Sequence, residues 1–231
     1  MKLALQAPTL HTLSIAGSDE RVPVNRVFCV GRNYAAHARE MGKDPEREAP
    51  FFFMKPASAV VDASAPCSVP YPSQTKNYHH EIELVVVIGQ GGKNIPVETA
   101  LEHVYGYAVG LDMTRRDIQL EARDKGRPWE FGKSFSQSAP IGAVYRAADI
   151  GHPAAATISL TVNGQARQSS DIAKLIWSVA ESIAVLSQYE ELQAGDVLMT
   201  GTPEGVNAVV AGDVMLGAIT GLGQIEVRVT A

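Results

Sequence analysis

The amino-acid sequence predicts an α+β fold, mainly β, in which a mixed sheet closes into a β-roll or barrel-like domain. Two observations indicate this class. Apolar runs of strand length, rich in Val, Ile, Tyr and Phe, outnumber helical patterns along the 231 residues. These runs also do not alternate regularly with helices, so the order of elements fits a doubly wound parallel sheet poorly.

The first 25 residues differ from the rest of the chain. They are irregular in pattern, and the turn residues Ala16-Gly17-Ser18-Asp19 indicate a short hairpin. The regular apolar runs begin at Arg26, and no internal repeat or low-complexity tract follows. We therefore expect a short N-terminal arm, residues 1–25, followed by a single domain, residues 26–231.

Eight apolar runs have the length and composition of strands. The dipeptide Asn163-Gly164 follows one of them, and this pair is typical of a hairpin turn. The predicted strands are 26–30, 51–54, 58–61, 84–88, 105–111, 157–162, 196–199 and 225–229.

Helical patterns are fewer. The clearest runs from Ser170 to Tyr189, where apolar residues recur at 3.6-residue spacing, with Ser169 or Ser170 as its cap. A second helix is expected to start at Thr114, because Thr114-Arg-Arg-Asp117 has the form of a capping box. A third, short helix is expected over 34–41.

Composition excludes several classes of protein. Apolar residues make up 45% of the chain, charged residues 19%, and the formal net charge is −5. No basic excess is present to bind a nucleic-acid backbone or a membrane surface, and no stretch reaches the roughly 18 apolar residues of a membrane span. Cys29 and Cys67 lack the spacing of a disulfide framework or a zinc site. The default expectation is a cytoplasmic protein without nucleic-acid or membrane partners.

Two glutamates lead into the strongly apolar run 84–88. On a strand, Glu81 and Glu83 project to one face, and Asp112 ends another apolar strand. Three clustered carboxylates without cysteine suit a hard cation such as Mg²⁺, Mn²⁺ or Ca²⁺. The alternative is an ordinary exposed strand end, with Asp112 as a helix cap. His79 faces with Glu81 and is expected beside the site rather than as a ligand, whereas the neighbouring histidine at position 80 faces away.

Other polar residues suggest catalysis and anion binding. His37 and Glu40 are three apart, so one turn of helix would place them together as a general base and its orienting carboxylate; the alternative is an incidental surface pair. Lys55 and Lys133 are single cations in apolar surroundings, either solvated or holding an anionic substrate. The glycine loop 200–206 could hold a carboxylate through its N–H groups and hydroxyls, but it lacks the lysine of a nucleotide-binding P-loop.

Six motifs in order resemble the fumarylacetoacetate hydrolase family. The resemblance covers nearly the whole chain from Arg26 and is closest to the short, single-domain bacterial acylpyruvate hydrolases. The motifs are GRNYAAHAREM, FFFMKP, HHEIEL, LDMTRRDIQ, PWEFGKSF and LMTGTPEGV.

The resemblance implies a β-roll catalytic domain, usually in a homodimer, with one Mg²⁺ or Mn²⁺ per chain. It implies that the metal ligands are Glu81, Glu83 and Asp112. It assigns the catalytic pair to His37 and Glu40, on a segment that orders when ligand binds, and places Lys133 at the reacting end. It implies substrate contacts from Arg116 and Gln119 and, to the substrate carboxylate, from Thr202; Lys55 and Arg32 are further candidates.

The implied reaction is hydrolysis of the C–C bond of a 1,3-diketo acid, most specifically fumarylpyruvate to fumarate and pyruvate in gentisate catabolism. The second carboxylate of that substrate needs a cation, for which Arg32, Arg39 and Arg116 are candidates. Relatives that decarboxylate oxaloacetate, interconvert its keto and enol forms or isomerise a hydroxymuconate-type diacid provide an alternative. A more distant alternative is a non-catalytic, metal-stabilised binding domain.

Overall fold

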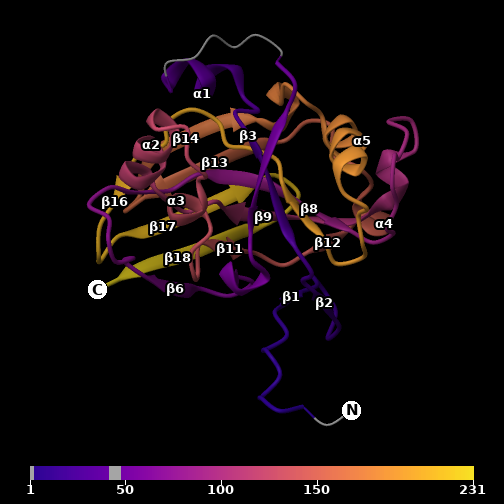
Figure 1. Ribbon diagram of the computed structural model, residues 1–231, viewed down its shortest axis with the longest axis horizontal. Coiled ribbons are helices and arrows are strands. Elements are labelled where there is room, and N and C mark those ends of the chain that lie inside the picture. The colour runs from indigo at the N-terminus through magenta and orange to yellow at the C-terminus, as the bar shows by residue number, and fades with distance from the viewer. Residues whose placement is uncertain (1–2, 42–47) are drawn as a thin grey trace.

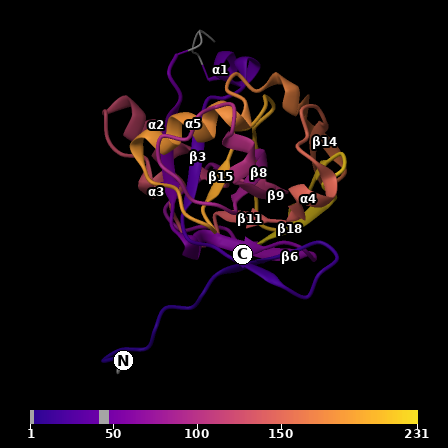
Figure 2. The same ribbon diagram turned by 90° about the vertical axis from the view of Figure 1, so that its right-hand side faces the viewer.

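Two β-sheets make up most of the computed structural model, which describes residues 3–41 and 48–231. The larger sheet curls into a half-barrel, and the smaller sheet packs across it (Figures 1 and 2). The sheets mix parallel and antiparallel pairs: β3 and β15 are parallel, for example, whereas β8 and β9 are antiparallel. The predicted mixed, mainly β fold is therefore confirmed.

The strands of the described residues form four sheets. The larger sheet has the order β4 (Phe51–Lys55), β3 (Val27–Gly31), β15 (Val197–Met199), β8 (Ile82–Ile88), β9 (Val104–Leu111), β11 (Ala139–Ile141) and β5 (Val60–Asp62), with β12 (Tyr145–Arg146) paired to β9. The second sheet has the order β14 (Gln165–Asp171), β13 (Thr157–Val162), β17 (Val214–Ile219), β18 (Gln224–Thr230) and β6 (Cys67–Pro70). The two small sheets are β10 (Thr114–Arg115), β7 (Tyr78–His79) and β16 (Ala208–Val209), and β1 (Thr12–Ser14) with β2 (Arg21–Pro23).

The helices are short and lie around the sheets (Figure 1). Among the described residues, no helix is both long and apolar enough to cross a membrane. The α-helices are α1 (Ala35–Glu40), α2 (Arg116–Asp124), α3 (Glu130–Lys133), α4 (Ala147–Ile150) and α5 (Val179–Tyr189), and 3₁₀ turns cover Ala57–Ala59, Ala100–His103 and Ile172–Lys174.

Strand β8 is buried on both faces. Ile82 and Leu84 enter the hydrophobic core that includes the inner face of the second sheet, whereas Val85 and Val87 enter a second core on the opposite face. This double burial explains why the run 84–88 is continuously apolar rather than alternating. The odd-numbered face of β8 is also the face that carries Glu83.

The N-terminal arm contains the expected hairpin, because β1 pairs antiparallel with β2. Leu13 and Val22 of this hairpin are buried in the second core. The carboxylate of Asp62 in β5 accepts a hydrogen bond from Ser14 Oγ at 2.7 Å and forms an ion pair with Arg21. Apolar burial and this polar anchor together attach the hairpin to the larger sheet.

Local turn chemistry explains the β13–β14 hairpin. Asn163 and Gly164 have φ angles of 50° and 77°, the left-handed values that a two-residue turn of this kind requires. The predicted turn is confirmed, and it places β14, including Gln168, beside β13.

Two predicted helix starts are wrong. The helix expected from Ser170 begins at Val179, because the backbone as far as Asp171 pairs with β13 and a 3₁₀ turn follows. Its cap is Ser178 rather than Ser169 or Ser170. Thr114 caps no helix either: it lies in β10, paired with β7, and its hydroxyl donates to the carbonyl of Asp112. In both cases strand pairing outweighs the local helix signal.

The strand predicted over 58–61 is displaced rather than absent. A 3₁₀ turn occupies Ala57–Ala59, and β5 follows at Val60–Asp62. The short helix expected over 34–41 corresponds to α1, Ala35–Glu40.

Candidate metal and substrate site

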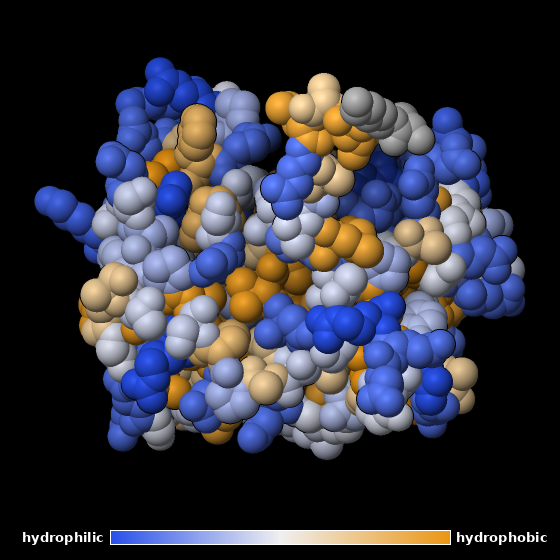
Figure 3. Space-filling model, turned by 90° about the horizontal axis from the view of Figure 1, so that it is seen from below, coloured by the Kyte–Doolittle hydropathy of each residue, from blue (hydrophilic) through white to orange (hydrophobic). Residues whose placement is uncertain are grey.

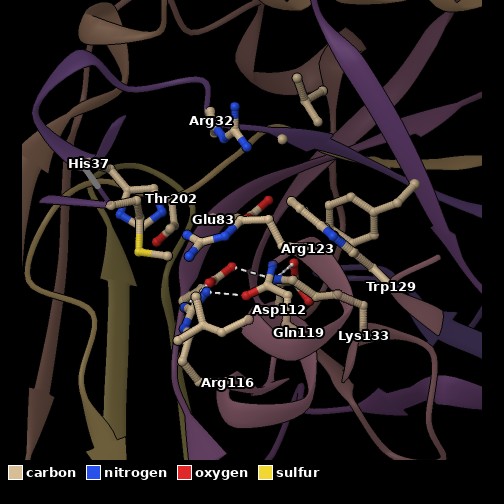
Figure 4. A pocket seen from close by; sticks show the side chains of 16 residues that line it. Arg32, His37, Glu83, Asp112, Arg116, Gln119, Arg123, Trp129, Lys133 and Thr202 are labelled. Carbon is tan, nitrogen blue, oxygen red and sulfur yellow. Dashed lines mark hydrogen bonds and ion pairs between the residues drawn. The ribbon is translucent and has the colours of Figure 1, made fainter. Parts of the chain in front are cut away.

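Glu81, Glu83 and Asp112 meet at the end of the β8–β9 pair. One ligand atom from each of the three carboxylates can be chosen so that all lie within 4.8 Å of one another, and none of the three residues is more than 4% exposed. The N–H of Asp112 donates to the carbonyl of Glu81 at 2.9 Å, which holds the end of β9 beside the start of β8. The predicted carboxylate cluster is therefore present, and Figure 4 shows two of its members, Glu83 and Asp112.

A glycine opposite Glu83 allows the two strands to approach. Gly110 is the register partner of Glu83, and a Cβ atom at this position would lie 2.6 Å from Cγ2 of Val85. A larger residue would thus push β9 away from β8 and separate Asp112 from the glutamates.

Cations neutralise part of the cluster. Lys133 Nζ lies 2.7 Å from Glu81 Oε2 and 2.6 Å from Asp112 Oδ2, and Arg116 forms an ion pair with Glu81. Burial opposes the charge of Glu81, but Lys133 and Arg116 outweigh it and hold the pKa of Glu81 below its usual value. Burial and the neighbouring carboxylates of Asp112 and Glu81 raise the pKa of Glu83. An added positive charge would therefore stabilise the ionised form of Glu83.

The polar atoms of the cluster fit a hard divalent cation. Asp112 Oδ1 is buried and has no hydrogen-bond partner among the described atoms, although Lys55 Nζ lies 2.8 Å away in an ion pair. Oxygen donors without cysteine suit Mg²⁺ or Mn²⁺. His79 is not one of the clustered residues: its Nε2 lies 2.8 Å from Asn77 Oδ1, and burial followed by Arg116 lowers its pKa to about 4.

A cavity of about 540 Å³, including its open mouth, lies beside the carboxylates. His37 lines this cavity and is 6% exposed, and its Nδ1 lies 3.1 Å from Oε2 of Glu40. The bond from His37 lowers the pKa of Glu40, and the N–H of Gly205 donates to the same carboxylate at 3.1 Å. A carboxylate on Nδ1–H leaves Nε2 as the unprotonated nitrogen, as a general base requires.

Four predicted substrate contacts also line the cavity: Arg32, Arg116, Gln119 and Thr202. Figure 4 shows His37 and Thr202 on one side of the carboxylates and Lys133 on another. The guanidinium of Arg116 is already paired with Glu81 and bonded to Gln119. In contrast, the guanidinium of Arg32 stacks over the ring of Phe51 at 5.2 Å and forms no ion pair with a described carboxylate.

Lys55 does not line the cavity, contrary to its expected contact with substrate. It is 1% exposed, and its ammonium donates to the carbonyls of Met113 and Lys133 and to Ser138 Oγ. These three acceptors and Asp112 occupy the ammonium fully. Lys55 therefore supports Asp112 without being part of the cavity lining.

Sequence reasoning missed Arg123 and Trp129, which also line the cavity. Arg116, Gln119 and Arg123 occur at helical spacing in α2, so they share one face. That spacing is the signal from which Arg123 could have been predicted. Trp129 stands in the PWEF motif, and its ring packs edge-on against Phe51 at 5.4 Å.

Comparison with known proteins decides the family. The model of the fumarylacetoacetate hydrolase C-terminal domain matches residues 26–230. The chain belongs to the fumarylacetoacetate hydrolase family. It is 48% identical over 186 residues to a fumarylpyruvate hydrolase from a Ralstonia species, covering 80% of this chain and 95% of the relative. It is 41% identical over 192 residues to an oxaloacetate tautomerase from Escherichia coli, covering 83% and 86% of the two chains.

A solved structure from the family is similar along nearly the whole length. The crystal structure of fumarylpyruvate hydrolase from Pseudomonas aeruginosa, in complex with Mn²⁺ and pyruvate, superposes with a TM-score of 0.97 at 61% identity and covers 99% of each chain. The family and the fold expected from the six motifs are thus confirmed.

Proposed function

We propose that this chain is a divalent-metal-dependent hydrolase that cleaves the C–C bond of an acylpyruvate, with fumarylpyruvate as the preferred substrate. The observation that carries the proposal is that one cavity brings together a carboxylate cluster and a His37–Glu40 pair. A scaffold domain has no need of buried carboxylates, since they destabilise the fold. The relatives named fumarylpyruvate hydrolase support the same reaction.

In this proposal Glu81, Glu83 and Asp112 hold Mg²⁺ or Mn²⁺. When bound, the metal supplies a Lewis acid that polarises the diketo acid and stabilises the leaving enolate. Nε2 of His37 takes a proton from the attacking water, and Glu40 stabilises the imidazolium that results. The added hydroxyl stays on the acyl product, and the pyruvate carbon takes up the proton.

The remaining lining residues bind and orient the substrate. Lys133 lines the cavity beside Glu81 and Asp112, so its ammonium is placed to stabilise negative charge that develops at the reacting end. Thr202, Gln119 and Arg116 contact the pyruvyl part. These roles rest on placement in the cavity.

Arg32 is our choice for the second carboxylate of fumarylpyruvate. Arg116 is committed to Glu81, and Arg39 is exposed on α1 and does not line the cavity. Arg32 lines the cavity, stacks over the ring of Phe51 and forms no ion pair with a carboxylate of the described residues. The acyl group and the place of the enzyme in gentisate catabolism stay predictions.

Oxaloacetate keto–enol tautomerisation is a second candidate, because relatives of that name cover most of the chain at 41% identity or slightly less. The same carboxylate cluster serves both reactions, since each passes through an enolate. The His37–Glu40 pair favours hydrolysis, which needs an activated water.

A homodimer is part of the proposal. Large hydrophobic side chains remain exposed on the single chain, including Phe131 (80%) and Tyr189 (73%). Figure 3 shows hydrophobic atoms near the centre of one face, surrounded by hydrophilic ones. Light scattering that gives twice the chain mass of 24.7 kDa supports a dimer, and the single-chain mass contradicts it.

The test of the function is a turnover screen. The protein is incubated with fumarylpyruvate, acetylpyruvate and oxaloacetate in the presence of Mg²⁺ or Mn²⁺, and the products are identified. We expect fumarate and pyruvate from fumarylpyruvate, loss of turnover in EDTA and recovery with added metal. Full activity in the chelator contradicts the metal requirement. Enolisation of oxaloacetate without any hydrolysis favours the second candidate.

A further inference from the structure

Gln168 is a fully buried amide behind the cavity. It lies in β14 of the second sheet, is 1% exposed and does not line the cavity itself. Its Nε2 donates to Thr202 Oγ1 at 2.8 Å and to the carbonyl of Pro203 at 2.9 Å. Its Oε1 accepts from the N–H of Ile82 at 3.1 Å and lies 2.9 Å from Nδ1 of His80. One side chain therefore joins the loop after β15 to the start of β8.

Main-chain partners determine the positions of the amide nitrogen and the amide oxygen of Gln168. The carbonyl of Pro203 can only accept, and the N–H of Ile82 can only donate, so the amide nitrogen must face Pro203 and the amide oxygen must face Ile82. The histidine at position 80 must in turn carry its proton on Nδ1, since Oε1 has none to give.

The same argument fixes the direction of the bond to Thr202. The hydroxyl oxygen of Thr202 accepts from the amide nitrogen, so its own hydrogen is left to be donated elsewhere. Within the described part of the chain, that hydrogen has no protein acceptor. Thr202 is 2% exposed and lines the cavity, so the hydroxyl hydrogen is available to a ligand there.

We propose that Gln168 is a positioning residue for carboxylate binding: it holds the Thr202 hydroxyl as a hydrogen-bond donor to an anionic oxygen in the cavity. Because Gln168 also bonds Ile82, which lies between Glu81 and Glu83, it sets this donor in register with the carboxylate cluster. The inference rests on the proposed function only in naming the ligand as the carboxylate of a 2-oxo acid.

The sharpest variant is Gln168→Glu, which keeps the shape of the side chain but replaces the N–H₂ group with oxygen. The Thr202 hydroxyl then donates to the new carboxylate and no longer to the ligand. The probe is pyruvate, titrated by calorimetry into the Mn²⁺-loaded protein. We expect its Kd to rise roughly ten- to hundredfold, the loss of one hydrogen bond to a charged group.

Three further variants separate positioning from a merely structural role. Gln165→Glu makes the same chemical change at an exposed site of β14 and should leave the Kd unchanged. Thr202→Val should weaken pyruvate binding as much as Gln168→Glu does. The Thr202→Val and Gln168→Glu double variant should lose no more than either single change, since both remove the same donor.

Gln168→Met covers the case in which a buried glutamate prevents folding, because it introduces no charge. The melting temperature of each variant is measured first, and a lower melting temperature with an unchanged Kd means that Gln168 only stabilises the fold. Wild-type Kd in Thr202→Val, or additive losses in the double variant, overturns the inference. The binding measurement needs no turnover, so failure of the wild-type protein to hydrolyse acylpyruvates refutes the proposed function without deciding this test.

Discussion

The Nζ atom of Lys55 lies 2.8 Å from Oδ1 of Asp112, although Asp112 lines the cavity and Lys55 does not. The ammonium also donates to Ser138 Oγ at 3.0 Å and to two main-chain carbonyls. Removing the Lys55 ammonium leaves Asp112 Oδ1 and three buried acceptors without their partner, although Lys133 still pairs with Oδ2 of Asp112. Lys55→Met should therefore lower the free energy of unfolding by about 3–5 kcal/mol, measured by urea denaturation.

The matched control for this prediction is Lys93→Met, because Lys93 is exposed. It should change the free energy of unfolding by less than about 0.5 kcal/mol. If Lys55→Met has wild-type stability but binds substrate more weakly, Lys55 does not act by supporting Asp112. That result would instead favour the contact with substrate that the sequence predicted.

Much of the fold could be predicted because its signals are local. The continuous apolar run 84–88 and the Asn163-Gly164 turn each specify their element within a few residues. The missed start of α5 is different. The residues from Ser170 to Ile176 have helical spacing, but β14 continues from the Asn163-Gly164 turn and pairs with β13 as far as Asp171, so the hairpin extends into the predicted helix. The turn residues predict that this hairpin exists, but the spacing of apolar residues does not show how far its second strand extends.

Asp62 should make the N-terminal hairpin sensitive to acid. Burial acts to raise the pKa of Asp62, but bonds from Ser14, Arg21 and Ser64 outweigh it and hold the pKa below its usual value. A depressed pKa contributes stability that is present above the unfolded value of about 3.9 and is lost as the pH falls through the folded value. Asp62→Asn should thus cost about 1–2 kcal/mol at pH 7.

Urea denaturation of the wild-type protein and Asp62→Asn between pH 3 and pH 7 tests this sign. The difference between the two should be constant from pH 7 to about pH 5 and should shrink toward pH 3, because the carboxyl of the unfolded chain takes up its proton before that of the folded protein. Asp19→Asn, a change at an exposed turn residue of the same hairpin, is the control. A difference that grows in acid contradicts the assignment.

The carboxylate cluster could be predicted from the sequence, whereas its surroundings could not. Two-residue spacing puts Glu81 and Glu83 on one face of a strand, and Asp112 ends the neighbouring strand, so both signals follow from strand geometry. Lys55 carries no comparable signal, because a lone lysine is usually solvated. Its burial depends on acceptors at residues 113, 133 and 138, which only the folded chain brings together.

Arg32→Ala should change which acylpyruvate is preferred. Arg32 lines the cavity and is not committed to a described carboxylate, so its loss removes the proposed partner of the second carboxylate of fumarylpyruvate. We expect KM for fumarylpyruvate to rise roughly tenfold or more, with little change for acetylpyruvate, which lacks that carboxylate.

Two control variants accompany this measurement. Arg39→Ala, at an exposed position of α1, should leave both KM values unchanged. A selective loss in Arg123→Ala instead of Arg32→Ala assigns the second carboxylate to Arg123, which also lines the cavity.

The last prediction separates hydrolysis from enolate chemistry. Nδ1 of His37 lies 3.1 Å from Glu40, and Gly205 holds the same carboxylate from the loop after β15. A Cβ atom at Gly205, whose φ is +93°, would lie 2.1 Å from the carbonyl oxygen of Arg167, so this anchor requires glycine. The His37–Glu40 pair is therefore positioned both by α1, which spans only six residues, and by the loop after β15.

His37→Ala should lower kcat for acylpyruvates by roughly 10²-fold or more, the usual effect of losing a general base. Affinity for Mn²⁺ should survive, because His37 is not among the clustered carboxylates. Glu40→Gln should act in the same direction, since it removes the charge that stabilises the imidazolium. Tautomerisation of oxaloacetate should fall less in both variants, as it needs no attacking water. Stopped-flow measurement of both reactions decides the point: hydrolysis at the wild-type rate in His37→Ala means that another group activates the water.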